Sequence, residues 1–545
     1  MRRPLAIIAA GLLSLALATP GLAADPVRLT GRMLVPAAPL AGGTWGIAFD
    51  GQDNLWAGHI SARTISKLDP DSGRILAQLG PADGVEGSDD IAFDPVSGDV
   101  CYTAILTGNV GCISPDGTQR TVTSLGMGVN PITFSDDGRL FVGKAFMADG
   151  IWELDPVTGD ATVIVAPTGV PGMDVNGFDW YQGFIYGPRT GTGEVVRIDP
   201  DVAGGDVTPV VAGLDPPKAV DIAPDGTMYV LVDEPGRVYE FDPETGETTL
   251  VADVPNSDNM AVDSRGRLFV SGGNDGAIYR VLPNGDPVTI SPAGMSAPYG
   301  LAALTDASGR EVVYAADKFL AWGFDGLTGQ QRLRTGAIPI IDTVAADDTN
   351  LVLTSFFTNA VWVWDPVAQV PLATYWDFAL PMNAIRFDGD LVVAELGTGQ
   401  VVRVDEATPG VRTVLAQLAY PLGLAATEDD LWAADWATGM LFQVVRDGVT
   451  LDPIVPVTTG LAGPEGLAVT AGGDLLVVES LAHRLTLVDL GRSPATLTSL
   501  LTDLPTGQAA APGMVPHWIF DGVAVGPSGA IYLSADGIAR YELHD

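Results

Sequence analysis

Short apolar segments separated by turns recur along the whole chain. Residues 45–72 contain an apolar segment, a turn rich in Asp and Gly, a second apolar segment and a third that ends at Asp69-Pro70. The segments are rich in Val, Ile and Leu and are bounded by Gly, Asp, Asn or Pro, which predicts β-meanders and not long helices. Further repeats begin near Asp90, Asn130, Asn176, Lys218, Asn259, Gly300, Asp342, Asn383, Gly423, Gly466 and Gly522.

The length of the repeat predicts the architecture. Repeats start about every 40–46 residues, which is the size of one propeller blade. A lone four-stranded sheet cannot bury its faces, whereas sheets packed around a closed ring can. We therefore predict an all-β fold, a β-propeller of about twelve four-stranded blades. One ring of that size would leave a very wide hole, so we expect two six-bladed propellers in tandem, over residues 25–295 and 296–545.

The two ends of the array suggest how a ring closes. Residues 27–35 look like an orphan outer strand, and residues 523–545 supply about three strands of a last blade. Pairing the two would close a ring. The expected division near residue 295 places these segments in different propellers unless the halves exchange a strand, and the sequence leaves this question open.

The N-terminal residues predict export. Arg2 and Arg3 precede an apolar run over residues 5–18, and small residues follow as far as Ala24. This order is typical of a cleavable secretory signal over residues 1–24, because the run is too short to span a bilayer. We expect a periplasmic or secreted protein without a membrane span.

The net charge limits the kinds of partner that we expect. The formal net charge of −39 repels phosphate backbones and anionic lipid, so nucleic acid and membrane surfaces are excluded as expected partners. A small-molecule ligand or a protein partner remains open.

The two cysteines, Cys101 and Cys112, flank a predicted hairpin turn. An oxidising compartment favours a local disulfide between them, and two buried thiols are the alternative.

One position per blade is expected to face the central axis, just before the innermost strand. In the first half these positions are Trp45, Asp89, Asn130, Asn176, Lys218 and Asp258. In the second half they are Tyr299, Asp342, Asn383, Leu422, Glu465 and Asp521. Carboxylate and amide oxygens of this kind suit Ca²⁺. The alternative is that Asp and Asn cap the turns that lead into the strands.

Two other residue types bear on this expectation. The four histidines are scattered without ligand spacing, which argues against zinc. Lys218 argues against an ion in the first half if it points inward. It is then a candidate substrate-binding residue for an anionic ligand.

Two segments resemble a known family. Asn176-Gly177-Phe178-Asp179-Trp180 is similar to the Asn-Gly-Leu-Asp-Trp stretch of the senescence marker protein/gluconolactonase family of propellers. The segment 258–270, with Asp258-Asn259-Met260 and a later Gly-Arg-Leu-Phe-Val, resembles that family's second metal-binding segment and the Asp-Asn pair of paraoxonase-type lactonases. Streptogramin lyases and NHL-type repeats share the more general pattern Gly-Ile-Ala-x-Asp followed by Asn-Leu-Trp, which residues 46–56 contain.

The resemblance implies a metal site and a reaction. It makes Asn176 and Asp258 ligands of an axial divalent ion, usually Ca²⁺, with Asn130 a further match and Asp89 added from the axial positions. It also makes Asp258 the candidate catalytic base of lactone hydrolysis. The family's two segments lie one blade apart, however, whereas here Lys218 lies between them, and Trp45 stands where the family has a metal-binding Glu.

We therefore expect an exported, calcium-dependent hydrolase of a small lactone or ester. The alternatives are a propeller that binds a ligand or a protein without catalysis, and a metal-dependent lyase. The fold does not decide among them.

Overall fold

A computed structural model describes residues 28–146, 148–232, 236–338, 340–408, 410–508, 510 and 520–544. Within them the chain forms twelve four-stranded antiparallel sheets and two short 3₁₀ helices, η1 (Pro81–Asp83) and η2 (Ser480–Ala482). The expected signal, residues 1–24, lies outside the described residues. No helix in the described part of the chain has the length and apolar content needed to cross a membrane.

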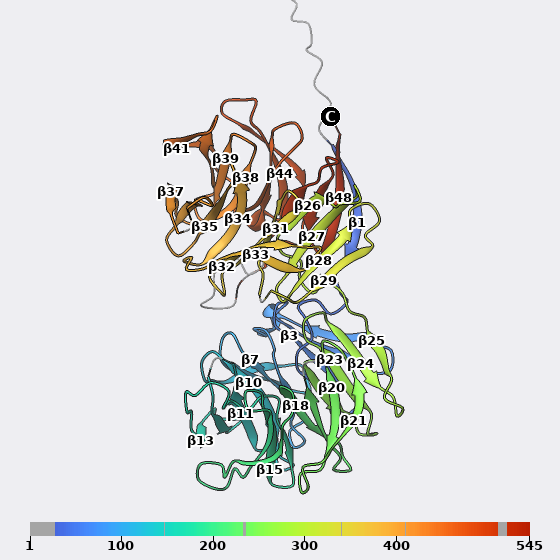
Figure 1. The fold of residues 1–545 in the computed structure, drawn as a ribbon. Coiled ribbons are helices and arrows are strands. Elements are labelled where there is room, and N and C mark those ends of the chain that lie inside the picture. The colour runs from blue at the N-terminus through green and yellow to red at the C-terminus, as the bar shows by residue number, and fades with distance from the viewer. Residues whose placement is uncertain are drawn as a thin grey trace, which may run out of the picture.

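Six sheets with consecutive strands form the first propeller (Figure 1). Their strands are β2 (Ile47–Phe49), β3 (Leu55–His59), β4 (Thr64–Leu68), β5 (Ile75–Leu79); β6 (Ile91–Phe93), β7 (Val100–Ala104), β8 (Asn109–Ile113), β9 (Gln119–Ser124); β10 (Val129–Phe134), β11 (Leu140–Lys144), β12 (Ile151–Leu154), β13 (Ala161–Val165); β14 (Asp179–Tyr181), β15 (Phe184–Arg189), β16 (Glu194–Ile198), β17 (Thr208–Ala212); β18 (Pro217–Ile222), β19 (Met228–Val232), β20 (Arg237–Phe241), β21 (Thr248–Asp253); and β22 (Asn259–Val262), β23 (Leu268–Gly272), β24 (Ala277–Val281), β25 (Pro287–Ser291).

The other six sheets form the second propeller. Their strands are β26 (Leu301–Thr305), β27 (Glu311–Asp317), β28 (Leu320–Asp325), β29 (Gln331–Thr335); β30 (Thr343–Asp347), β31 (Asn350–Ser355), β32 (Ala360–Asp365), β33 (Val370–Tyr375); β34 (Pro381–Phe387), β35 (Asp390–Glu395), β36 (Gln400–Val404), β37 (Arg412–Gln417); β38 (Pro421–Ala426), β39 (Leu431–Asp435), β40 (Met440–Arg446), β41 (Val449–Thr458); β42 (Pro464–Val469), β43 (Leu475–Glu479), β44 (Arg484–Asp489), β45 (Thr496–Leu501); and β46 (Val523–Val525), β47 (Ile531–Ser534), β48 (Gly537–His544) with β1 (Arg28–Pro36).

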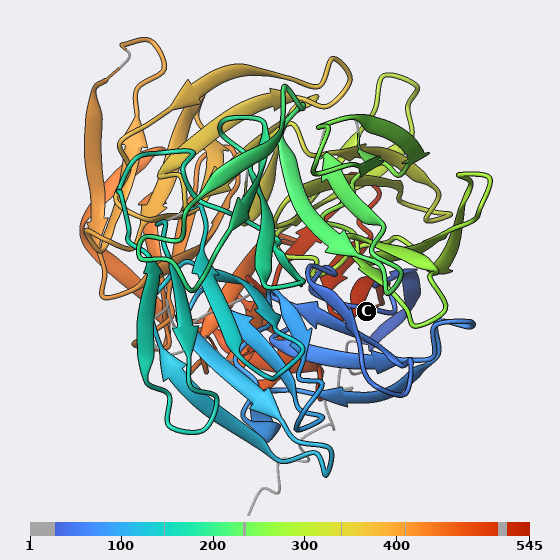
Figure 2. The ribbon, with the colours of Figure 1, turned by 90° about the horizontal axis from the view of Figure 1, so that it is seen from below.

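Both rings close through their innermost strands. In the first propeller β2, β6, β10, β14, β18 and β22 contact one another in turn, and β22 returns to β2. In the second, β26, β30, β34, β38, β42 and β46 do the same, and β46 returns to β26. Figure 2 shows the blades radiating from the centre when the molecule is viewed from below. The prediction of an all-β fold with twelve blades in two six-bladed rings is confirmed.

The first strand of the described chain belongs to the second propeller. β1 pairs antiparallel with β48, from Arg28 opposite His544 to Pro36 opposite Gly537. It is the outer strand of the last blade, next to β48, β47 and β46. Placing this segment in the first propeller, as the division at residues 25–295 does, is therefore wrong. Residues 28–36 close the second ring, so the whole first propeller is an insertion within the second.

Two neighbouring segments connect the rings. The chain leaves β1 for β2 through residues 37–46 and returns from β25 to β26 through residues 292–300. The segments are hydrogen-bonded together: Ala38 N donates to Met295 O at 2.7 Å, and Gly42 N donates to Ser296 O at 2.7 Å. An ion pair between Arg334 of the second propeller and Asp275 of the first adds to this contact. The double connection holds the two rings together on one side.

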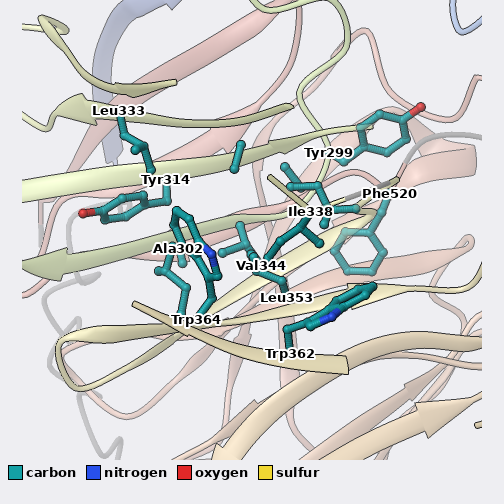
Figure 3. Packing of buried hydrophobic residues seen from close by; sticks show 14 of the residues in the cluster. Tyr299, Ala302, Tyr314, Leu333, Ile338, Val344, Leu353, Trp362, Trp364 and Phe520 are labelled. Carbon is teal, nitrogen blue, oxygen red and sulfur yellow. The ribbon is translucent and has the colours of Figure 1, made fainter. Parts of the chain in front are cut away.

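Apolar side chains fill the space between blades. Alternate residues of each strand face the neighbouring sheet, as the two-residue period of a β-strand requires. The largest apolar cluster lies in the second propeller and includes Tyr299, Ile338, Trp362, Trp364 and Phe520 (Figure 3). Cys101 on β7 and Cys112 on β8 are directly opposite each other in the hairpin, with a Cα–Cα distance of 4.0 Å, and are joined by a disulfide.

Candidate functional site

The mouth of the first propeller faces the second propeller. We define the mouth as the six axial positions named from the sequence: Trp45, Asp89, Asn130, Asn176, Lys218 and Asp258. The indole of Trp45 packs edge-on against Phe319 of the second ring, with 4.9 Å between ring centroids. Nearby, Gln508 of the second ring donates to the carbonyl of Ser61 at 3.0 Å. The second ring therefore covers part of the mouth (Figure 1).

Lys218, Asp258 and Asp89 form the charged centre of the mouth. Lys218 Nζ lies 3.3 Å from Asp258 Oδ1, and each side chain keeps about a fifth of its surface exposed, 21% and 20%. Asp89 is buried beside them. Burial, together with the charges of Asp258 and Asp90, raises the pKa of Asp89 well above its usual value, and Lys218 opposes that shift. Three of the residues expected from the sequence therefore come together.

The two amide positions are Asn130 and Asn176, which enter the two blades that precede the blade of Lys218. Both side chains are buried. The side-chain oxygen of Asn176 is buried without any hydrogen-bond partner in that part of the chain. A buried acceptor left in this state is costly, so Asn176 is suited to a ligand that brings a donor or a positive charge.

Close packing of the backbone brings Trp45 next to Asp258. A Cβ atom on Gly273 would lie 2.8 Å from Asp258 Cβ and 3.1 Å from Trp45 Cε3. Only glycine leaves room there for the indole and the carboxylate to share one wall. The mouth thus combines an aromatic surface, an ion pair and a buried carboxyl group.

A second polar layer lies deeper in the channel of the first propeller, in a cavity of about 190 Å³. Asn259 Nδ2 donates to Asp90 Oδ1 at 3.0 Å across this channel. Burial raises the pKa of Asp90 to about 7. Thr133 Oγ1 donates to Asp179 Oδ1 at 3.1 Å.

The Asp179 carboxyl group is in turn hydrogen-bonded to that of Asp221. Burial raises the pKa of both groups, and the charge of Asp179 adds to the shift of Asp221. Two carboxyl groups this close cannot both ionise easily, so the pair favours a shared proton.

The second propeller differs from the first both at the axial end of its channel and deeper inside it. Its channel, of about 220 Å³, has alanine at five of the six deeper positions, Ala302, Ala345, Ala425, Ala468 and Ala524. The sixth is Arg386, which pairs with Asp347 and Glu406. The fold therefore does not require the acidic pair of the first ring. At its axial end Tyr299 and Leu422 belong to the apolar cluster that also contains Ile338 and Phe520 (Figure 3).

The acidic axial residues of the second propeller are occupied by partners. Asp342 binds Lys318 at 3.4 Å. The backbone nitrogen of Asp521 donates to Glu465 Oε2 at 2.9 Å, and the two carboxyl groups are hydrogen-bonded to each other. Hydrocarbon, one ion pair and one pair of carboxyl groups thus occupy five of the six axial positions of this ring, which makes the first propeller the better candidate for a ligand site.

Sequence reasoning missed the deeper carboxyl groups. Asp179 stands in the quoted Asn-Gly-Phe-Asp-Trp segment, and Asp221 stands three residues after Lys218, yet neither was assigned a role. The signal was present: three positions beyond each axial position, the first half has two Asp and a Thr where the second half has Ala in five blades of six.

The mouth offers the hard oxygen donors that Ca²⁺ prefers. Carboxylates come from Asp89 and Asp258, and the unpartnered oxygen of Asn176 is available to a cation. Among the described residues no three His, Cys, Asp or Glu side chains are grouped so that they could hold a metal ion. A Ca²⁺ ion would therefore depend on the amide oxygens as well, and it would lie next to the ammonium group of Lys218.

Comparison with known proteins yields weak structural matches. No protein-family model matches the chain, and no curated protein matches it significantly. The extracellular domain of the putative one-component system BT4673 from B. thetaiotaomicron is 11% identical with a TM-score of 0.31, over 95% of this chain and 82% of that chain. PorZ, a surface component of the type-IX secretion system of Porphyromonas gingivalis, is 11% identical with a TM-score of 0.36, over 94% and 87%.

These TM-scores are too low to support an argument about function. The resemblance to the gluconolactonase family, which no family model supports, stays a prediction.

Proposed function

We propose that this chain is an exported propeller protein that binds a small polar molecule at the mouth of its first ring and hydrolyses a lactone or ester bond in it. The observation that supports this most directly is the Lys218–Asp258 ion pair, which places a carboxylate and an ammonium group together beside buried Asp89. The disulfide of the second blade, together with the predicted signal, supports a periplasmic or secreted location.

Each residue has a defined part in the reaction. Asp258 accepts a proton from a water molecule as the oxygen of that water attacks the carbonyl carbon. The bond from that carbon to the alcohol oxygen then breaks, and Asp258 returns the proton to the leaving oxygen. Lys218 binds an anionic group of the substrate and orients it. Trp45 supplies the apolar wall of the site.

Calcium is part of the proposal. Asp258, Asp89, Asn176 and Asn130 would hold the ion, which would polarise the substrate carbonyl when bound.

The test is hydrolysis of a panel of small lactones and esters by purified protein, with Asp258→Asn as the variant. We expect a loss of at least a hundredfold in kcat, since a general base contributes about 10²–10⁴. Asp253→Asn is the matched control, because Asp253 is an exposed carboxylate that pairs with Arg237 on the neighbouring strand. Activity of Asp258→Asn equal to that of the wild type would exclude the assigned role.

A non-catalytic binding propeller is the second candidate, and one observation favours it. The second ring covers part of the mouth, through Phe319 on Trp45, and Asp89, Asn130 and Asn176 are all more than 90% buried. Such a site suits retention of a ligand more than rapid exchange of substrate and product. Tight ligand binding by wild-type protein that hydrolyses no member of the panel would favour this reading.

A further inference from the structure

The second propeller reaches the mouth of the first through one tight turn. Asp317 on β27 pairs directly with Leu320 on β28, so Lys318 and Phe319 alone form the turn between these strands. Turns of four residues stand at the corresponding places in other blades, at 60–63, 273–276 and 356–359. The shorter turn leaves room for the first propeller to approach, and Phe319 packs against its Trp45.

Lys318 anchors this turn to the axis of the second propeller. Its backbone has a φ of 54°, the left-handed conformation that two-residue hairpin turns favour. Its ammonium nitrogen lies 3.4 Å from Asp342 Oδ1, and 5.3 and 5.0 Å from the ring centroids of Tyr299 and Phe356. An ion pair and two cation–π contacts thus act on one side chain. They hold the turn, and with it Phe319, in one place.

Phe319 meets the wall of the mouth at Trp45. The two aromatic rings lie edge to face, with 4.9 Å between their centroids, and both side chains remain partly exposed. Within the described part of the chain Trp45 Nε1 has no hydrogen-bond acceptor, so packing alone holds the indole. The same indole shares a wall with Asp258, because both side chains border the position of a Cβ atom on Gly273. The contact made by Phe319 therefore lies at the edge of the proposed site.

We propose that Phe319 limits the size of the group that can lie beside Trp45 and Asp258. The inference rests on the proposed function, because it concerns the ligands that the proposed site admits. A small lactone reaches Asp258 while the aromatic contact stays intact, whereas a bulky substituent must first separate the two aromatic side chains. Phe319 is therefore a specificity-determining residue, and the site belongs to both propellers.

The aromatic contact gives the size of the effect. A bulky group enters only in the fraction of molecules in which the contact is open, so removing the contact removes that cost. One aromatic pair accounts for about tenfold in this fraction, which corresponds to about 1.4 kcal/mol. Phe319→Ala should therefore speed the entry of a bulky group about tenfold and leave that of a small group unchanged.

The experiment measures access to the mouth without a substrate. Both cysteines of the chain are joined in the disulfide, so Asp258→Cys introduces the only free thiol. Full-length protein with this change is labelled with the small reagent methyl methanethiosulfonate and with a bulky biotinylated methanethiosulfonate. The two labelling rates are then compared with and without Phe319→Ala.

Phe357→Ala is the matched control. Phe357 is a phenylalanine on the corresponding turn of the next blade, 49% exposed, so its removal takes the same side chain from the same propeller. Phe319→Leu serves as a second variant if Phe319→Ala does not fold, as judged by circular dichroism. Lys218→Cys is the second reporter, because its side chain keeps 21% of its surface exposed beside Asp258.

The outcomes separate the inference from the proposed function. Faster labelling by the bulky reagent alone, and in the Phe319 variants alone, supports the inference. Equal rates of bulky labelling with and without Phe319 overturn it. Equal acceleration of both reagents, or by both phenylalanine variants, also overturns it, since general loosening would then explain the result. If Phe319 has no effect while Asp258→Asn abolishes lactone hydrolysis, the inference fails and the hydrolase stands; the reverse pair of results has the opposite meaning.

Discussion

Replacing Glu465 by Gln should remove a pH-dependent loss of stability from the second propeller. The Glu465 carboxyl group is 1% exposed. Its Oε1 accepts a hydrogen bond from Trp436 Nε1 at 3.2 Å, and its Oε2 accepts one from the backbone of Asp521 at 2.9 Å. Burial raises the pKa of Glu465 from 4.5 to about 7. The folded protein therefore binds this proton more tightly than the unfolded chain.

The sign and size of the effect follow from this difference. A raised folded-state pKa gives stability that is fully present below 4.5 and is lost as the pH rises from 4.5 through about 7. Raising the pKa from 4.5 to about 7 corresponds to about 3 kcal/mol of stability. Burial and the neighbouring Glu465 also raise the pKa of Asp521. Removing the charge of Glu465 also removes its contribution to the raised pKa of Asp521, which further stabilises the variant relative to the wild type at high pH.

The assay is urea unfolding of wild-type and Glu465→Gln protein at pH 5 and pH 8. Gln keeps an acceptor oxygen for the backbone of Asp521 and can donate to its carboxylate. We expect the stability of the variant relative to the wild type to rise by most of this amount, about 2.5 kcal/mol, between the two pH values. A difference that does not change with pH would refute the reasoning.

Glu479→Gln is the matched control, because Glu479 lies on the paired strand β43 of the same blade. Burial alone would raise its pKa, but hydrogen bonds from Arg484 and Thr486 hold the pKa of Glu479 below its usual value. The sign is therefore reversed. This carboxylate stabilises the fold above the unfolded pKa of 4.5, and the contribution is lost only as the pH falls below that value, so the stability of the control variant relative to the wild type should change little between pH 5 and pH 8.

Three further predictions concern other parts of the molecule. Asp221→Ala introduces the residue that the second ring has at this position in five blades. The melting temperature of this variant relative to wild type should increase from pH 6 to pH 9, because the raised pKa of Asp221 makes its ionised form costly beside Asp179. A difference in melting temperature that stays constant with pH in scanning calorimetry would argue against the shared proton. Cys101→Ser with Cys112→Ser should cost about 3 kcal/mol in urea unfolding, the value expected for so short a loop. Deleting residues 28–36 should abolish the cooperative unfolding of the second propeller and leave one calorimetric transition, that of the first; two retained transitions would contradict the role of β1.

The sequence predicts the fold because the repeat is local. Each blade is a meander of neighbouring strands, so apolar alternation and turn residues such as Asp69-Pro70 specify it within about 40 residues. The exchange of residues 28–36 is different. A lone strand with one polar face fits any open blade edge, and the choice of β48 depends on which ring stays incomplete. That is a property of the assembled molecule.

The site is predicted in part for the same reason. Reading one position per repeat brings together Asp89, Lys218 and Asp258, because the blades converge on one axis. The pairing of Asp179 with Asp221 was missed, since it requires the register of each innermost strand relative to its neighbour. The sequence also has acidic residues at axial positions in both halves. Only the packing of Tyr299 and Leu422 shows that apolar side chains occupy part of the axial end of the second propeller.

The insertion of one ring into the other has a consequence for biogenesis. β1 is made before the first propeller, but its partner β48 follows about 500 residues later. The first propeller has all its strands between these two and can fold while β1 waits as an unpaired edge, which favours aggregation unless a chaperone covers it. A chain released early would carry a finished first ring and an open second one. Quality control of this protein can therefore act on a single strand pair, β1 with β48, as the mark of completion.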